Sequence, residues 1–137
     1  MSKLYMGFDA GTQSVKVAVY DEQFNCLTSH SLPTHLHYPQ PGWVEMSADE
    51  FLEITVKSMA ACAQSLREMG RDPKDVCAVM GDGIICGIVG VNPDGDAVTP
   101  YINYLDSRTT PDVEALNARE LEIWGRETGN PVASPMF

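Results

Sequence analysis

The segment Asp9-Ala10-Gly11-Thr12-Gln13-Ser14-Val15-Lys16 lies between two short stretches of alternating apolar residues. In the first, Leu4, Met6 and Phe8 share one side of an extended chain; in the second, Val15, Val17 and Val19 do the same. The residues between these stretches are too few for a crossover helix, so the strands cannot run parallel. The sequence therefore predicts an antiparallel pair of strands joined by a tight hairpin.

The residue types of this hairpin suit an anion site. Gly11 allows a tight turn and a close approach of the backbone, and Lys16 offers a positive charge. Three residues, Thr12, Gln13 and Ser14, offer hydrogen-bond donors. Asp9 would hold Mg²⁺, which bridges carboxylate and phosphate oxygens in many nucleotide sites. The alternative is a polar hairpin turn that binds nothing.

The next segments alternate strands, a loop and a helix. A turn at Asp21–Asn25 leads to a third strand from Cys26 to Leu32, and a loop follows at His35–Trp43, where two prolines and a glycine break regular structure. A capping box of Ser47 and Glu50 predicts a helix ending near Gly70. We expect one stripe of that helix to face the core, consisting of Leu52, Val56, Met59, Ala63 and Leu66.

The second half of the chain predicts more strands and another helix. Val76–Met80 and Ile84–Val91 are rich in apolar residues, and Asn92–Gly95 is a turn signal. A helix is expected to begin at Thr110, with Val113, Leu116 and Trp124 as core candidates and Gly125 or Gly129 near its end. No closing element follows, so we expect a domain that is incomplete at the C-terminus. The composition is α/β, but the opening differs from a nucleotide-binding βαβ unit.

Composition limits the function classes. The 137 residues suffice for one domain, and the net charge of −10 comes with no cluster of Lys or Arg, so nucleic acid is not an expected partner. The four cysteines form no C-x-x-C pair, which favours reduced thiols and a cytoplasmic location. No apolar run approaches the roughly 20 residues that span a bilayer, so no membrane role is expected.

Motifs in a fixed order resemble the FGGY carbohydrate kinase family. Asp9-x-Gly11-Thr12-x-Ser14, with Lys16 two residues on, is similar to the phosphate motif of the actin, Hsp70 and sugar kinase superfamily. The segment Tyr38–Glu45 resembles the family's Y-P-x-P-G-W-x-E, and the helix from Ser47 follows it directly. Gly87-Ile88-Val89 leads into Asp94-Gly95, and Asp106–Thr109 resembles the end of W-x-D-x-R-T. The resemblance spans Leu4 to Thr110.

This resemblance implies a ribonuclease-H-like, actin-type ATPase fold whose mixed sheet opens with antiparallel strands. The implied activity is ATP- and Mg²⁺-dependent phosphorylation of a sugar, ketose or polyol hydroxyl. Residues 1–137 would be a partial amino-terminal domain, and the second nucleotide-binding lobe and the base aspartate would lie downstream. No catalytic residue is therefore expected in this fragment, which alone should be inactive, and a homodimer is expected for the full-length form.

The sugar pocket is where the chain departs from its relatives. Ile84-Ile85-Cys86-Gly87 stands where xylulose-specific relatives carry Q-M-H-G and glycerol-specific ones Q-R-E-T, so Ile85 and Cys86 cannot make the usual polar contacts. Tyr104 replaces the usual Trp. Asp106, oriented by Arg108, would accept hydrogen bonds from the sugar, unless the two only organise their own loop. Asp82 is a further sugar contact or a turn residue.

The sequence also allows other functions and contains motifs that resemble other kinds of site. A non-catalytic sugar- or nucleotide-binding regulator on the same scaffold is the main alternative function, and a chaperone- or filament-type ATPase leaves the Tyr38–Glu45 segment unexplained. The glycines at 81, 83 and 87 do not match the dinucleotide fingerprint, because no helix pattern follows them. His35 and His37 lack an evident third metal ligand. We expect Trp43 to anchor its loop by packing.

Overall fold

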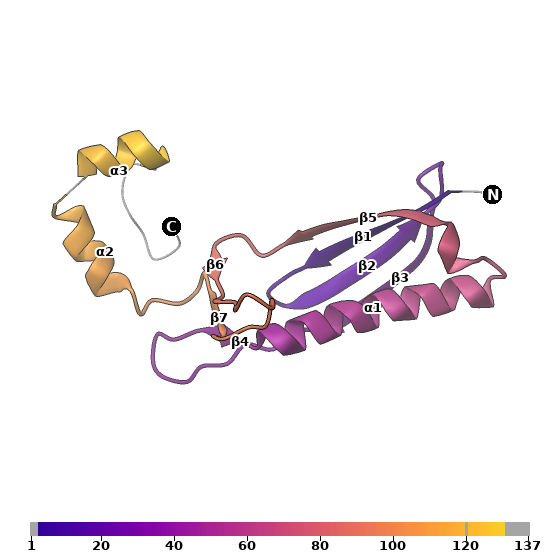
Figure 1. Cartoon of the computed structure of the whole chain (residues 1–137), viewed down its shortest axis with the longest axis horizontal. Helices are drawn as coiled ribbons and strands as arrows, with labels where there is room; N and C mark the ends of the chain where they lie inside the picture. The colour runs from indigo at the N-terminus through magenta and orange to yellow at the C-terminus, as the bar shows by residue number, and fades with distance from the viewer. Residues whose placement is uncertain (1–2, 120, 131–137) are drawn as a thin grey trace. The chain divides into compact units, whose positions relative to one another are not determined.

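The computed structural model describes residues 3–119 and 121–130 (Figure 1). The chain divides into two compact units. The first comprises the chain up to His35 together with Ser47–Ile84, and the second comprises Leu36–Met46 together with the chain from Ile85 onward.

The first unit is built on a four-stranded sheet with the order β3-β2-β1-β5 (Figure 1). Strands β1 (Leu4–Ala10), β2 (Ser14–Tyr20) and β3 (Cys26–Pro33) pair antiparallel, whereas β5 (Val76–Gly83) runs parallel to β1. The predicted opening hairpin and third strand are confirmed, and the sheet is mixed.

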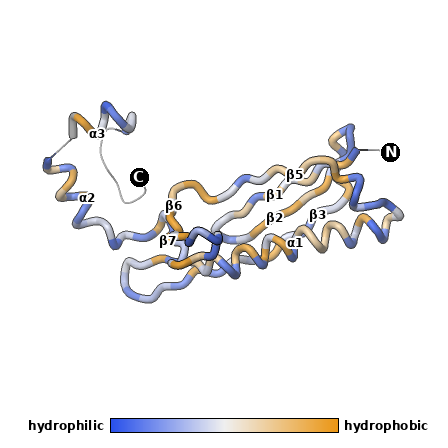
Figure 2. Tube along the Cα trace, in the orientation of Figure 1, coloured by the Kyte–Doolittle hydropathy of each residue, from blue (hydrophilic) through white to orange (hydrophobic). Residues whose placement is uncertain are grey.

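Helix α1 (Ala48–Glu68) packs on this sheet, mainly against β2 and β3. It begins as predicted, because the Ser47 hydroxyl accepts a hydrogen bond from the Glu50 N–H at 3.2 Å. Gly70, at φ +73°, ends it in the left-handed conformation that glycine adopts without strain. Figure 2 shows the hydrophobic residues along β1 and β2, and Val15, Val17 and Val19 of this set are buried.

The predicted core stripe of α1 is wrong in its first half. Leu52 and Val56 are exposed, whereas Ile54, Ser58, Cys62 and Leu66 form the buried row. These four residues are spaced four apart, so they lie on one face of the helix. The pattern was hidden because Ser58 and Cys62 are small, and the larger apolar side chains beside them dominate a count of hydrophobic residues.

A glycine in β5 makes room for an aromatic ring that packs against the core. Gly81 lies opposite Phe8 in the sheet, and a β-carbon built on Gly81 would overlap the Phe8 ring. We expect Gly81→Ala to lower the free energy of unfolding by about 1–3 kcal/mol, because the ring must leave its position.

Gly83→Ala in the same strand is the matched control. Its β-carbon would lie 3.5 Å from the nearest atom, the Ala10 carbonyl oxygen, which is ordinary contact. Urea denaturation of both variants measures the difference, and equal stability of the two would show that the Phe8 ring moves at no cost.

The second unit holds a small antiparallel sheet with the order β4-β7-β6, formed by Glu45–Met46, Tyr101–Asn103 and Gly87–Ile88. The predicted strand Ile84–Val91 is thus reduced to two residues. Cys86 has φ +63°, which interrupts extended structure just before β6. The predicted turn at Asn92–Gly95 is present, with the Gly95 N–H donating to the Asn92 carbonyl at 3.0 Å.

Two short helices replace the single one expected after Thr110. They are α2 (Thr110–Asn117) and α3 (Leu121–Thr128). The Arg119 N–H donates to the Leu116 carbonyl, three residues back, which is a typical way for an α-helix to end. Gly129, at φ +75°, follows α3 as predicted. No helix in the described part of the chain has the length and apolar character that crossing a bilayer requires.

Candidate functional site

The hairpin between β1 and β2 is the candidate site of the first unit. The Gly11 N–H donates to the Ser14 carbonyl at 3.0 Å and closes the turn. Within the described residues, no group accepts a hydrogen bond from the N–H of Thr12 or Gln13. The turn therefore presents free backbone donors, as an anion site requires.

Asp9 and Lys16 flank this turn. They lie opposite each other in the β1–β2 ladder, with Lys16 Nζ 3.8 Å from an Asp9 carboxylate oxygen. The side chains are 56% and 66% exposed, respectively, so the pair is weak and neither group is locked in a buried contact. Both also line a hollow of about 550 Å³ on the sheet. The two charges are thus accessible to a ligand.

Asp82 lies next to Asp9, which the sequence did not predict. The two residues are opposite each other in the parallel β1–β5 pair, near the carboxyl ends of both strands. One Asp82 oxygen accepts the N–H of Gly83 at 2.8 Å, and the residue is exposed. The structure therefore places Asp82 beside the β1–β2 hairpin. In residues 3–119 and 121–130, no group of three or more His, Cys, Asp or Glu side chains could hold a metal alone.

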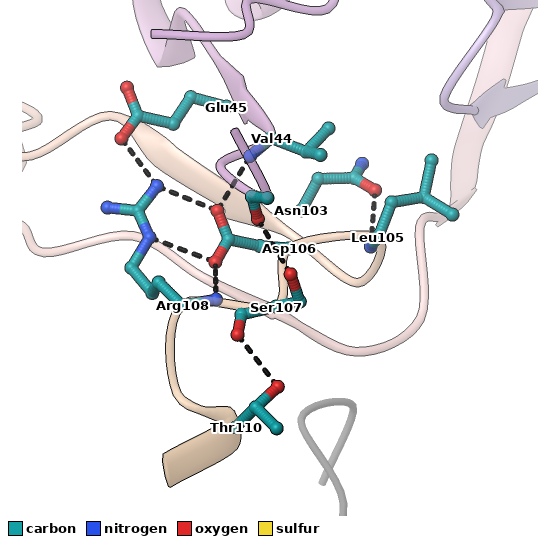
Figure 3. Close-up of polar contacts among 9 residues, drawn as sticks. Val44, Glu45, Asn103, Leu105, Asp106, Ser107, Arg108 and Thr110 are labelled. Carbon is teal, nitrogen blue, oxygen red and sulfur yellow. Dashed lines mark hydrogen bonds and ion pairs between the residues drawn. The ribbon is translucent and has the colours of Figure 1, made fainter. Parts of the chain in front are cut away.

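A second candidate site, in the second unit, is a charge cluster around the buried carboxylate of Asp106 (Figure 3). One Asp106 oxygen accepts the Val44 N–H at 2.7 Å and Arg108 Nη2 at 2.7 Å, and the other accepts the Arg108 N–H and Nε, each at 2.9 Å. Arg108 Nη2 also contacts Glu45 at 2.6 Å, and the guanidinium lies 3.8 Å from the Trp43 ring centre. The expected packing role of Trp43 matches this contact.

This geometry sets the charge of both partners. Burial raises the pKa of Asp106, but the hydrogen bonds from Arg108 and from the Val44 N–H, together with the guanidinium charge, outweigh burial and lower it. Hydrogen bonding to Asp106 raises the pKa of Arg108, burial opposes this, and Glu45 reinforces it. Asp106 is thus an anion and Arg108 a cation at neutral pH. With four donors on its two oxygens and a side chain only 3% exposed, Asp106 has little capacity left for a ligand.

The remaining predicted pocket residues are in the second unit. Ile85 is 78% exposed, while Cys86 and Tyr104 are partly buried. In the described part of the chain, no hydrogen bond joins any of the three to Asp106 or Arg108. The structure therefore brings Asp106 and Arg108 together, brings Asp82 to the hairpin, and leaves the other three without a polar contact to the cluster.

Two residues in these clusters were not assigned a role from the sequence. Thr34 binds the hairpin turn, and Glu45 completes the Arg108 pair. The signal for Glu45 was present in the Tyr38–Glu45 segment, which matches a family motif ending in Glu. Thr34 carries no comparable signal, because it follows Pro33 in a stretch without a motif.

Comparison with known proteins gives one family. The pattern of the FGGY family of carbohydrate kinases, N-terminal domain, matches residues 4–136. A glycerol kinase of Geobacter sp. (strain M21) is 29% identical over 136 residues, covering 96% of this chain and 26% of that protein. A xylulose kinase of Staphylococcus xylosus is 24% identical, covering 80% of this chain and 22% of that protein. The chain thus spans about a quarter of the length of the curated relatives it matches.

A solved structure has the same fold. The xyloylose kinase from Brucella ovis superposes with a TM-score of 0.86 at 22% identity, covering 98% of this chain and 27% of that chain. At 22% sequence identity, this structural similarity establishes the fold alone. It confirms the predicted actin-type ATPase fold with a mixed sheet that opens antiparallel.

Proposed function

The chain belongs to the FGGY family of carbohydrate kinases, and we propose that it is the amino-terminal part of an enzyme that transfers the terminal phosphate of ATP to a hydroxyl of a sugar, ketose or polyol. In this proposal the β1–β2 hairpin holds the phosphates, and the second unit contributes part of the sugar pocket. The catalytic base and the second nucleotide-binding lobe come from chain beyond residue 137.

The observation that carries the proposal is the open hairpin. Phosphoryl transfer needs mainly alignment and charge neutralisation around the phosphate. The unbonded N–H groups of Thr12 and Gln13 supply aligned donors, and Lys16 supplies a nearby positive charge. A hairpin that served only as a turn would need none of these features. Its leading carboxylate, Asp9, is also free of any buried structural contact.

The residues present fit Mg²⁺ bound together with ATP. Mg²⁺ favours one or two carboxylates, substrate phosphates and several waters over an all-protein cage. Asp9 is exposed beside the hairpin and offers one such carboxylate. When bound there, the cation would neutralise charge on the phosphates. The chain's own contribution is to place that carboxylate at the end of β1, beside the turn.

For the sugar side, we propose a modified role for the Asp106–Arg108 pair. Because both Asp106 oxygens are occupied by donors of the chain, the pair supports the sugar pocket by fixing the loop that carries Tyr104. Tyr104, Ile85 and Cys86 remain the proposed sugar-facing residues. Such a pocket offers fewer polar contacts than the pockets of relatives that carry Q-M-H-G or Q-R-E-T. Specificity for glycerol is therefore disfavoured.

A substrate screen tests the proposal. The full-length protein, with MgATP, is mixed with pentuloses, hexuloses, polyols or aldonates, and ADP release is measured. We expect at least one class to raise ADP release well above the rate without acceptor. No stimulation by any class, combined with binding of a sugar or nucleotide, would instead support the non-catalytic regulator.

A further inference from the structure

One residue outside every motif holds the tip of the hairpin. The Thr34 hydroxyl donates to the Thr12 carbonyl at 2.7 Å and lies 3.3 Å from the Gly11 carbonyl, and the Thr34 N–H donates to the Gln13 carbonyl at 3.1 Å. Three successive carbonyls of the turn are thus bound by one residue. A hydroxyl has one proton, so its two acceptors share a bifurcated bond.

The position of Thr34 follows from the sheet. Strand β3 pairs with β2 as far as Ser14, which lies opposite Pro33, so the next residue reaches the turn. Thr34 is partly buried, which strengthens a hydrogen bond relative to one in water.

The direction of these carbonyl groups determines the direction in which the backbone N–H groups of the turn point. In a planar trans peptide the N–H points opposite to the carbonyl of the same peptide unit. When Thr34 holds the carbonyls of Gly11, Thr12 and Gln13, the following N–H groups point away from Thr34. Those of Thr12 and Gln13 are the groups with no acceptor in the described residues.

We propose that Thr34 is a positioning residue for the phosphate-binding hairpin, which it orients by binding the carbonyl side of the turn so that the N–H side faces the terminal phosphates of the nucleotide. This inference rests on the proposed kinase function. Thr34 does not touch the nucleotide in this account; it acts through the turn.

Two substitutions in the full-length protein test the hydroxyl. Thr34→Val keeps the shape and the backbone N–H but removes the hydroxyl, and Thr34→Ser restores it. We expect Thr34→Val to lower kcat/KM for MgATP by about 10- to 100-fold, since small misplacements of binding groups cost rate steeply, with KM for the sugar changed less than about twofold. Thr34→Ser should stay within about threefold of wild type. Thr34→Ala, expected to behave like Thr34→Val, replaces it if Thr34→Val does not fold.

Thr55→Val is the matched control. The Thr55 hydroxyl also donates to a backbone carbonyl, that of Phe51 at 2.8 Å, and is also partly buried, but it lies in α1. We expect Thr55→Val to lower the melting temperature without changing KM for MgATP. A Thr34→Val variant that likewise lost only melting temperature, with kinetics unchanged, would overturn the inference.

Calorimetry with MgATP separates this inference from the proposed function. If the wild-type protein phosphorylates an acceptor and Thr34→Val binds MgATP equally well, the role of Thr34 is rejected while the kinase function stands. If the wild-type protein phosphorylates nothing but Thr34→Val still weakens MgATP binding about 10-fold or more, the function fails and the positioning role stands. If the wild-type protein binds no MgATP, both are rejected.

Discussion

Asp9→Asn in the full-length protein is expected to lower kcat with MgATP by about 10³-fold, the upper range for losing one group that stabilises transition-state charge. The amide keeps the size of the carboxylate but removes the charge that would hold Mg²⁺. The concentration of Mg²⁺ that gives half-maximal activity should also rise. Because Asp9 flanks the hairpin that we propose binds phosphate, affinity for the sugar, measured by calorimetry, should change little.

The surroundings of Asp9 make this a test of chemistry and not of folding. Among the described residues, its only ion pair, with Lys16, is long and exposed, and such pairs contribute about 0–1 kcal/mol to stability. The variant should therefore unfold at nearly the same urea concentration as the wild type.

Glu53→Gln controls for the change in net charge. Glu53 is exposed on α1 and pairs with Lys57, so its substitution also removes one negative charge from a surface ion pair of the first unit. Its kcat should equal that of the wild type. If Asp9→Asn were as active as Glu53→Gln, the hairpin would lose its assigned role in metal and phosphate binding.

Local features of the fold were predictable from the sequence. The hairpin required only two alternating stretches and a short connection, and the start of α1 required only Ser47 and Glu50, which are three residues apart. In both cases the structure forms through hydrogen bonds between residues close in the sequence, so it does not depend on contacts with distant residues. The face that α1 buries depends on what it packs against, and there the small residues Ser58 and Cys62 were missed.

The contacts that shape the candidate site join residues far apart in the sequence. Thr34 meets the turn across more than 20 residues, and Arg108 meets Glu45 across 63. Asp82 reaches Asp9 only because β5 adds parallel to β1. Single residues of this kind carry no periodicity or spacing signal, because the sheet order that joins them is set by the whole chain. The family motifs indicated which segments matter and that Asp106 and Arg108 meet, but not the contacts between residues far apart in the sequence.

Asp106→Asn is expected to lower the free energy of unfolding by about 3 kcal/mol at neutral pH. The amide nitrogen would face a donor in either orientation, because each Asp106 oxygen accepts two hydrogen bonds from the chain. Of its charged partners in residues 3–119 and 121–130, Arg108 would keep only Glu45. Tryptophan fluorescence during urea denaturation can follow this loss, since Trp43 contacts Arg108.

The difference between wild type and Asp106→Asn should depend on pH. The pKa of Asp106 is lowered in the folded chain, so on acidification the unfolded chain takes up the proton first, near pH 4. Stability from this carboxylate is therefore fully present above about pH 5 and is lost as the pH falls below about 4. The asparagine variant cannot titrate there, so the gap between the two proteins should shrink in acid.

The same variant separates the two roles considered for Asp106. A carboxylate that mainly bound sugar would leave urea unfolding without sugar nearly unchanged when replaced, and its loss would appear as weaker sugar affinity. A carboxylate that fixes Val44 and Arg108 should show the stability loss and its pH dependence even without sugar. Asp94→Asn, in the exposed turn after Asn92, should change the free energy of unfolding by less than about 0.5 kcal/mol. If Asp106→Asn matched that control at neutral pH, the cluster would lose its structural role, and direct sugar binding would become the better account of Asp106.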